Sequence, residues 1–193
     1  MSWHEVLVQV DRECRQREIP MLGPQKAALL VELLKQHCPK TVVEVGTAIG
    51  YSGLWIAATL REIGQGKLIT LEMDLQRAEE AAHNFQQAGV NDLITQYLGD
   101  AREKIKEIDA AIDFLFLDGG FSNYYRCFLA AREKLLDGAV LLADNAAIGA
   151  DEMADYLNHV RANYPSRTQW FETDLKWVPR DAMEISTYRA TDE

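Results

Sequence analysis

The amino-acid sequence predicts an α/β fold, in which a single doubly wound, mostly parallel sheet carries helices on both faces. Short apolar runs alternate with segments of helical periodicity, and the last two apolar segments are joined by a short connection. Such alternation is typical of right-handed βαβ units, and a terminal hairpin adds an antiparallel strand. The 193 residues contain no repeat or linker, so we expect one domain spanning 1–193.

The expected parallel strands are apolar runs, several of which end at a glycine or an acid. Continuous runs of this kind are typical of strands that are buried on both faces. They lie at 41–45, 67–72, 93–98, 111–118 and 139–144. The segments 167–175 and 182–190, separated by KWVPRD, complete a seven-stranded sheet with an antiparallel C-terminal strand.

Helical periodicity fills the spaces between these strands. Four helices are expected between strands, at about 51–63, 74–88, 122–136 and 149–163. Two more helices, at about 2–17 and 24–37, precede the first strand. In doubly wound sheets ligands bind beyond the carboxyl ends of the strands, so residues at those ends are the candidates for a functional site.

Composition excludes several classes of function. The net charge of −10 argues against a nucleic-acid partner, because phosphates attract basic proteins. The N-terminus lacks the features of a signal peptide, and no apolar run approaches the length of a membrane span. Three scattered cysteines fit reduced thiols. We therefore expect a cytoplasmic protein that acts on a small molecule, with no nucleic-acid or membrane partner.

A glycine turn follows the first strand in VVEVGTAIGYSG, residues 42–53. Gly46 and Gly50 permit close approach of the backbone to a ligand, and Ser52 with the free amides of the helix start can bind polar groups. Glu72 ends the next strand, where a carboxylate can accept hydrogen bonds from a ribose diol. Together these features predict a nucleoside ligand. The alternative is a tight turn with a solvent-facing glutamate.

The stretch VGTAIGYS, followed by LEMD, resembles the catechol and caffeoyl-coenzyme A type O-methyltransferases, a class I family that depends on S-adenosylmethionine (SAM). The resemblance runs from about Ile19 to Arg161. It implies a Rossmann-like methyltransferase fold, with residues 1–38 as an N-terminal helical lid and residues 39–193 as the core. The turn lacks the G-x-G-x-x-G order of dinucleotide sites, because its glycines lie at 46, 50 and 53.

This resemblance implies a set of donor-binding residues. Residues around the methionine part would be Gly46, Thr47, Tyr51 and Ser52, with Asp118 also near the donor. Residues around the ribose and adenine would be Glu72, Met73, Asp100 and Ala101. For Met73, packing in the hydrophobic core is the open alternative.

Acids close the fourth and fifth strands. Asp118 ends one strand, and Asp144 with Asn145 follows the other. Neighbouring strands lie about 5 Å apart, so these side chains can converge. Two carboxylates and an amide oxygen suit Mg²⁺ first, and also Mn²⁺ or Ca²⁺. The resemblance implies the same metal-binding trio. The alternative is that Asp118 caps the next helix and the other two residues form a turn.

Methyl transfer from a sulfonium requires alignment of the acceptor oxygen with the methyl carbon and removal of the acceptor proton. A metal ion that chelates two adjacent hydroxyls would serve both needs, which predicts a phenolic, catechol-like acceptor. The family usually carries a lysine three positions after the acid of strand four, and Phe121 stands there instead. We expect Asp118 to act with the bound metal. A base such as Lys176, or a changed or lost activity, are the alternatives.

The acceptor wall is expected in the loop KWVPRD, where Trp177 could stack on an aromatic ring and Arg180 could meet a carboxylate. The alternative is an exposed hairpin tip. Relatives in the resembled family are often homodimers, so we expect a homodimer. Three other functions stay open: a methyltransferase for a non-catechol acceptor, a SAM-binding protein without activity, and a nicotinamide-dependent oxidoreductase.

Overall fold

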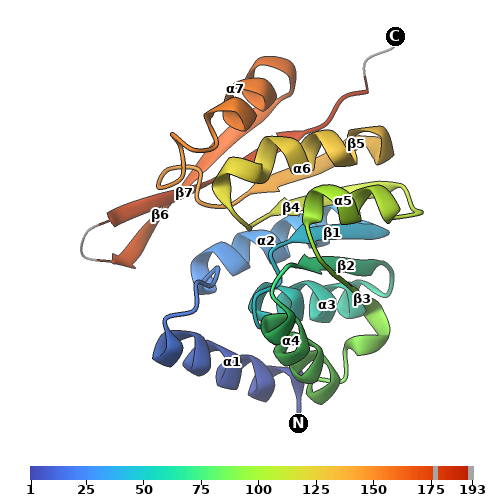
Figure 1. Cartoon of the computed structure of the whole chain (residues 1–193), viewed down its shortest axis with the longest axis vertical. Coiled ribbons are helices and arrows are strands. Elements are labelled where there is room, and N and C mark those ends of the chain that lie inside the picture. The colour runs from blue at the N-terminus through green and yellow to red at the C-terminus, as the bar shows by residue number, and fades with distance from the viewer. Residues whose placement is uncertain (176–177, 191–193) are drawn as a thin grey trace.

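The computed structural model describes residues 1–175 and 178–190. A seven-stranded sheet in the order β3-β2-β1-β4-β5-β7-β6 forms its centre, with helices on both faces (Figure 1). The strands are β1 (Thr41–Val45), β2 (Lys67–Glu72), β3 (Ile94–Leu98), β4 (Ile112–Leu117), β5 (Leu135–Ala143), β6 (Ser166–Leu175) and β7 (Val178–Thr187). Strands β1 to β5 are parallel to one another, and β7 is antiparallel to both β5 and β6. The expected fold class is confirmed.

Helices connect the strands and precede the sheet. The α-helices are α1 (Trp3–Arg17), α2 (Pro24–His37), α3 (Tyr51–Ile63), α4 (Leu75–Gln87), α5 (Ala101–Lys104), α6 (Tyr124–Ala131) and α7 (Ala154–Asn163). Short 3₁₀ helices are η1 (Asn91–Leu93), η2 (Ile105–Glu107), η3 (Phe121–Asn123) and η4 (Arg132–Lys134). Among the described residues, none of the helices has the length and apolar character needed to cross a membrane.

Three expected elements differ in their bounds: α7 begins at Ala154 instead of about 149, β7 begins at Val178 instead of Ala182, and the segment between α6 and β5 is divided differently. The helix predicted over 122–136 ends at Ala131, and β5 begins at Leu135, four residues before the predicted strand. The early part of β5 pairs Leu135 with Ile112, and the register then shifts before Val140 pairs with Phe114. Asp137 and Gly138 lie at this irregularity and interrupt the apolar run, which is why the strand was predicted to begin only at Ala139.

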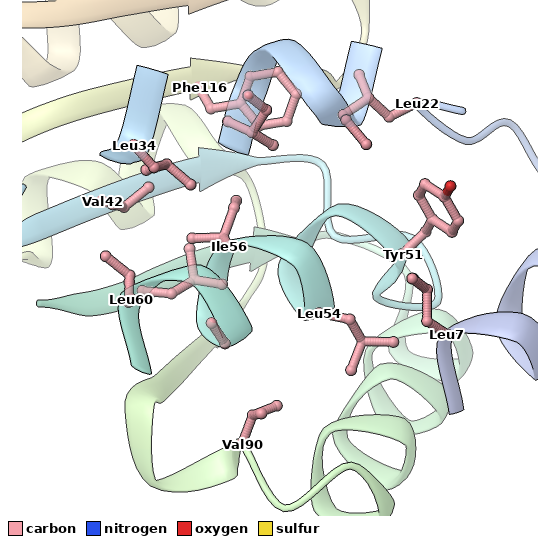
Figure 2. Packing of buried hydrophobic residues seen from close by; sticks show 14 of the residues in the cluster. Leu7, Leu22, Leu34, Val42, Tyr51, Leu54, Ile56, Leu60, Val90 and Phe116 are labelled. Carbon is pink, nitrogen blue, oxygen red and sulfur yellow. The ribbon is translucent and has the colours of Figure 1, made fainter. Parts of the chain in front are cut away.

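Two hydrophobic layers sandwich the sheet. Strand residues alternate between them, so that Val42 faces one layer while Val43 faces the other. The first layer is made by α1 to α4, and Figure 2 shows part of it, including Leu34, Leu54 and Val42. The second layer is made mainly by α6 and α7. Helices α1 and α2 of the expected lid therefore contribute to the core of the domain.

The order of the strands reverses direction between β1 and β4, which creates a switch point in the sheet. The Asp118 N–H donates to the Val45 carbonyl at 2.9 Å, and the Asp144 N–H donates to the Leu117 carbonyl at 2.9 Å. These bonds continue the ladders β1–β4 and β4–β5 past the ends of the strands. The turn after β1 and the loops after β4 and β5 therefore meet at one edge, where open α/β sheets bind ligands.

Candidate functional site

A cavity of about 930 Å³ lies at this edge. Its volume is within the range of small-molecule sites in proteins. Loops from the carboxyl ends of β1 to β5 line it, together with Pro20, Met21 and Leu22 from the segment between α1 and α2. The predicted site residues on its wall are Gly46, Thr47, Tyr51, Ser52, Glu72, Met73, Asp100, Ala101, Asp118, Phe121, Asp144 and Asn145. The structure thus brings the expected donor residues and the expected metal trio to a single cavity.

The glycines of the first turn serve contacts within the protein. A Cβ on Gly46, whose φ is +99°, would lie 2.3 Å from the Asp118 carbonyl oxygen. A Cβ on Gly50, whose φ is +96°, would lie 2.8 Å from the Phe85 ring. The need for glycine at these two positions therefore has causes within the protein, and their close approach to a ligand stays a prediction. Gly46 allows the turn after β1 to pack directly on the loop that carries Asp118.

Glu72 holds the same turn from the other side. Its Oε2 accepts the Ala48 N–H at 2.8 Å, and its Oε1 accepts the Met73 and Asp74 N–H groups at 2.9 and 3.0 Å. Ala48 has a φ of 45°, a left-handed conformation that is unfavourable for alanine. The carboxylate is only 9% exposed, and the wall of the cavity includes it. The alternative of a solvent-facing glutamate therefore does not apply.

A chain of hydroxyl groups joins the turn to a buried acid. Thr70 Oγ1 donates to Glu44 Oε2 at 2.6 Å, so the 2.5 Å contact between Thr47 and Thr70 has Thr47 Oγ1 as its donor. The hydroxyl of Thr47 is therefore engaged inside the protein. Glu44 is fully buried, and its burial raises its pKa to about 7, although the Ser52 and Thr70 hydroxyls act in the opposite direction.

This raised pKa predicts a pH-dependent stability. Folded Glu44 keeps its proton up to about pH 7, whereas an unfolded carboxyl releases it near its ordinary pKa of 4.5. The free energy of unfolding should therefore fall as the pH rises between these two values. Glutamine cannot lose a proton, so the free energy of unfolding of Glu44→Gln should rise by about 2 kcal/mol relative to that of the wild type as the pH goes from 5 to 7.5. Urea denaturation at both pH values measures this difference. A constant difference across that range would contradict the assignment.

The residues expected near the adenine lie at the rim of the cavity. Met73 is 78% exposed, so core packing is not its role in this structure. Asp100 caps α5 by accepting the Arg102 N–H at 2.9 Å and also pairs with the Arg102 guanidinium. The hydrogen bond to the Arg102 side chain lowers the pKa of Asp100 to about 2. Arg102 and Ala101 border the cavity beside it.

Tyr51 and Ser52 begin α3 and are both largely buried. The ring of Tyr51 belongs to the first hydrophobic layer, in the part that Leu7 of α1 also enters (Figure 2). Burial raises the pKa of the Tyr51 hydroxyl. Both residues border the cavity at the start of the helix, where free backbone amides are available for polar ligand groups.

The predicted metal trio converges at the ends of β4 and β5. Leu117 and Ala143 are partners in the ladder, so Asp118 and Asp144 occupy the next positions on neighbouring strands. Asn145 has a φ of 58°, which turns the chain immediately after Asp144. The Asn145 Nδ2 donates to Asp181 Oδ2 at 2.9 Å, so the amide nitrogen is fixed and its oxygen is the atom left for a ligand.

Two residues of this cluster were not predicted. Lys26 of α2 places its Nζ 2.5 Å from Asp144 Oδ1 and 2.6 Å from Asp181 Oδ2. Asp181 lies on β7, within the loop sequence where Trp177 and Arg180 had been singled out. A signal for Lys26 was present, because it shares the buried face of α2 with Leu30 at the i+4 position.

The three acids outnumber the one lysine. Burial and the charge of Asp144 raise the pKa of Asp118 well above its ordinary value, although Lys26 acts against them. Burial also raises the pKa of Asp144 to about 6, although Lys26 acts against it. Asp181 differs, because hydrogen bonds and the charge of Lys26 outweigh its burial and lower its pKa. The cluster therefore has an excess of negative charge on the side of Asp118 and Asp144.

The excess of negative charge bears on whether a divalent cation would fit the predicted trio. Two under-compensated carboxylates and an amide oxygen are hard oxygen donors, which suits Mg²⁺, Mn²⁺ or Ca²⁺. Within 1–175 and 178–190, no group of three or more His, Cys, Asp or Glu side chains is arranged to hold a metal, so a cation here would depend on two carboxylates and the Asn145 amide oxygen. The trio of Asp118, Asp144 and Asn145 fits the cation in donor chemistry and in charge.

Phe121 occupies the position of the missing lysine and lines the cavity. Its ring contacts Tyr124 edge to face, with 6.2 Å between ring centroids. It also covers Gly149, where an added Cβ would lie only 2.8 Å from the ring. Phe121 is therefore packed as an apolar wall, and it supplies no proton acceptor.

The expected acceptor loop is only partly described. Lys176 and Trp177 lie outside the described residues. Arg180 is exposed and does not border the cavity; its Nε pairs with Glu172 Oε1 at 3.4 Å, and its guanidinium lies 5.1 Å from the centre of the Trp170 ring. The structure thus places Arg180 on the outer hairpin, in agreement with the alternative of an exposed tip.

A comparison with known families decides which class of enzyme this cavity belongs to. The family described as a methyltransferase domain matches residues 43–146, which contain the glycine turn, Glu72 and the trio of Asp118, Asp144 and Asn145. The chain belongs to this methyltransferase family. The alternative of a nicotinamide-dependent oxidoreductase is therefore set aside.

Similar proteins within the family indicate the type of methyltransferase. Catechol O-methyltransferase B of Danio rerio is 27% identical over 190 residues, which are 95% of this chain and 71% of the relative. Catechol O-methyltransferase of Mycobacterium tuberculosis is 32% identical over 142 residues, 72% of this chain and 63% of the relative. The resemblance to this family of O-methyltransferases is confirmed, and the chain is a SAM-dependent O-methyltransferase.

Solved structures show the same fold. The O-methyltransferase of Bacillus cereus, in a complex with SAH, has a TM-score of 0.82 at 21% identity, with 96% of this chain and 91% of that chain covered. The O-methyltransferase TomG of Streptomyces achromogenes, in a complex with SAM, has a TM-score of 0.82 at 23% identity, with 96% and 90% covered. These likenesses support the Rossmann-like methyltransferase fold of the family member.

Proposed function

We propose that this O-methyltransferase transfers a methyl group from SAM to a hydroxyl of a small phenolic, catechol-like acceptor with the help of a divalent cation. The observation that carries the proposal is the single cavity that joins the glycine turn and Glu72 to the acids after β4 and β5. A donor nucleoside and an acceptor oxygen must meet in one enclosed space for methyl transfer. The names of the catechol O-methyltransferase relatives support the acceptor class.

The donor side is assigned to residues that are already fixed by the fold. Three backbone N–H groups hold the carboxylate of Glu72 in one orientation. A carboxylate has about four acceptor sites, so capacity remains for a ribose hydroxyl. Met73 is exposed at the rim and can cover an adenine, while the start of α3 presents free amides to the methionine part. The complexes of the similar folds with SAM and SAH support this assignment.

The acceptor side is assigned to the acid cluster and to Phe121. Asp118, Asp144 and Asn145 would hold the cation, Mg²⁺ in the first place. When bound, the cation supplies positive charge that orients a diol and lowers the pKa of one hydroxyl. Phe121 forms an apolar wall that excludes water and can pack against an aromatic ring. Since phenylalanine accepts no proton, Asp118 remains the residue that we propose to act together with the cation.

Removing one proposed ligand should remove the cation. We expect Asp144→Ala to weaken Mg²⁺ binding at least about 100-fold in calorimetry, because a buried carboxylate ligand and its charge are lost. Asp100→Ala is the matched control, since Asp100 borders the same cavity but pairs with Arg102. Equal Mg²⁺ affinity of Asp144→Ala and the wild type would contradict the proposed ligand set.

The activity is tested with a donor that carries a labelled methyl group. We expect the wild-type enzyme with Mg²⁺ to methylate catechol or protocatechuate and to leave phenol unmodified. Phe121 specifically favours a second candidate, a SAM-binding protein without methyl transfer. Donor binding without label transfer to any phenol at any pH would support that candidate. Transfer to phenol as fast as to catechol would instead indicate an acceptor without adjacent hydroxyls.

A further inference from the structure

Lys26 is a buried cation inside the acid cluster. It lies in the first turn of α2 on the face that packs against the core, and it is only 9% exposed. Its Nζ contacts Asp144 and Asp181 at 2.5 and 2.6 Å. A buried ammonium is costly unless it is paired, and two carboxylates satisfy that requirement here.

The two acids depend on Lys26 to different degrees. Asp181 also accepts the Ile148 N–H at 3.1 Å and the Asn145 Nδ2 at 2.9 Å. It is therefore well satisfied and anchors the ammonium from the side of β7. Asp144 Oδ1 meets the same ammonium at 2.5 Å as an ion-pair and hydrogen-bond partner. Lys26 is thus shared by two acids, of which Asp144 also borders the cavity.

The shared acid is also a proposed ligand of the divalent cation. Lys26 does not border the cavity, so it reaches the site from behind, through the carboxylate of Asp144. Two cations that share one carboxylate at short range repel each other, and this repulsion is weakly screened where both are buried. The ammonium therefore reduces the negative charge that Asp144 offers to a metal ion.

We propose that Lys26 is a built-in counter-ion that competes with the divalent cation for Asp144 and so sets the cation affinity of the site. This inference rests on the proposed cation site. Without a divalent cation, Lys26 compensates part of the acid charge and keeps the cluster folded. With one, Asp181 retains the ammonium while Asp144 turns its charge toward the cavity. Lys26 is in this view a positioning residue, because it acts through Asp144.

The test compares the Mg²⁺ affinity of the wild type and Lys26→Met by calorimetry, with folding checked by circular dichroism. Methionine has a similar length without the charge, so we expect Lys26→Met to bind Mg²⁺ at least about tenfold more tightly. Arg102→Met is the matched control, since Arg102 borders the cavity but pairs with Asp100, and we expect less than about a threefold change. An equal or weaker affinity of Lys26→Met overturns the inference.

A second measurement covers the case in which Lys26→Met is poorly folded without metal. Thermal melting with increasing Mg²⁺ should then raise its midpoint more than that of the wild type, because the ion becomes the main counter-charge of the acids. An equal rise in both proteins contradicts the inference. If the wild type binds Mg²⁺, loses it on Asp144→Ala and is unaffected by Lys26→Met, the competition fails while the proposed cation site stands. If neither protein binds Mg²⁺, both fail.

Discussion

Gly46→Ala should be among the most damaging single substitutions in this protein. The added methyl group would lie 2.3 Å from the Asp118 carbonyl oxygen, and a residue with φ of +99° resists any side chain. The atoms that the methyl group would meet belong to the backbone of Asp118 and Gly119 and cannot rotate aside. The turn after β1 must therefore move away from the loop that carries Asp118. We expect the free energy of unfolding, measured by urea denaturation, to fall by about 3 kcal/mol or more.

The matched control is Gly64→Ala. Gly64 has a similar φ of +83°, but no atom lies within 4 Å of an added Cβ. Only the backbone strain remains, for which we expect a loss of about 1 to 2 kcal/mol. Equal losses for both variants would contradict the view that the turn is packed against the Asp118 loop. In the folded fraction of Gly46→Ala we also expect weaker donor binding, since the turn has moved.

Glu72→Ala should cause the largest loss of donor affinity. Its carboxylate fixes the left-handed Ala48 in the turn and is proposed to accept hydrogen bonds from the ribose. A hydrogen bond to a charged group contributes about 1.5 to 3 kcal/mol, so loss of the one that a ribose hydroxyl would make corresponds to at least about a tenfold change in affinity, to which the release of the Ala48 turn adds. Calorimetry with S-adenosylhomocysteine (SAH) measures this change directly.

Two further variants show whether the effect of Glu72→Ala comes from the loss of a negative charge or from the position of the carboxylate. Glu152→Ala removes another acid that borders the same cavity, and we expect less than about a threefold effect on SAH binding. Glu72→Gln keeps one acceptor oxygen and should fall between the wild type and Glu72→Ala. Glu72→Ala with wild-type affinity for SAH would refute the donor assignment.

Much of the fold followed from local sequence patterns. Apolar runs such as TVVEV predicted β1 with the bounds that the structure has, because a strand buried on both faces needs apolar residues at successive positions. The gathering of Asp118 and Asp144 followed from a general property of parallel sheets, whose carboxyl ends share one edge. The start of β5 was missed because a register shift is set by pairing between strands.

Parts of the site that depend on distant contacts were beyond such patterns. Lys26 and Asp181 are 155 positions apart, and only packing of α2 against the sheet places them together. The contact between Gly46 and the Asp118 loop was missed for the same reason. A glycine in a turn indicates that a side chain would not fit there, but it does not indicate which neighbour excludes the side chain. A lysine on the buried face of α2 was the one local sign of the acid cluster, because such a residue requires a buried partner.

We propose that the cavity at the β1–β4 switch point binds the methyl donor. Calorimetric titration of the wild-type protein with SAH tests it most directly, with NAD as the comparison ligand. We predict saturable binding of one SAH per chain and no binding of NAD. A folded protein that binds no SAH, with or without Mg²⁺, would contradict the account.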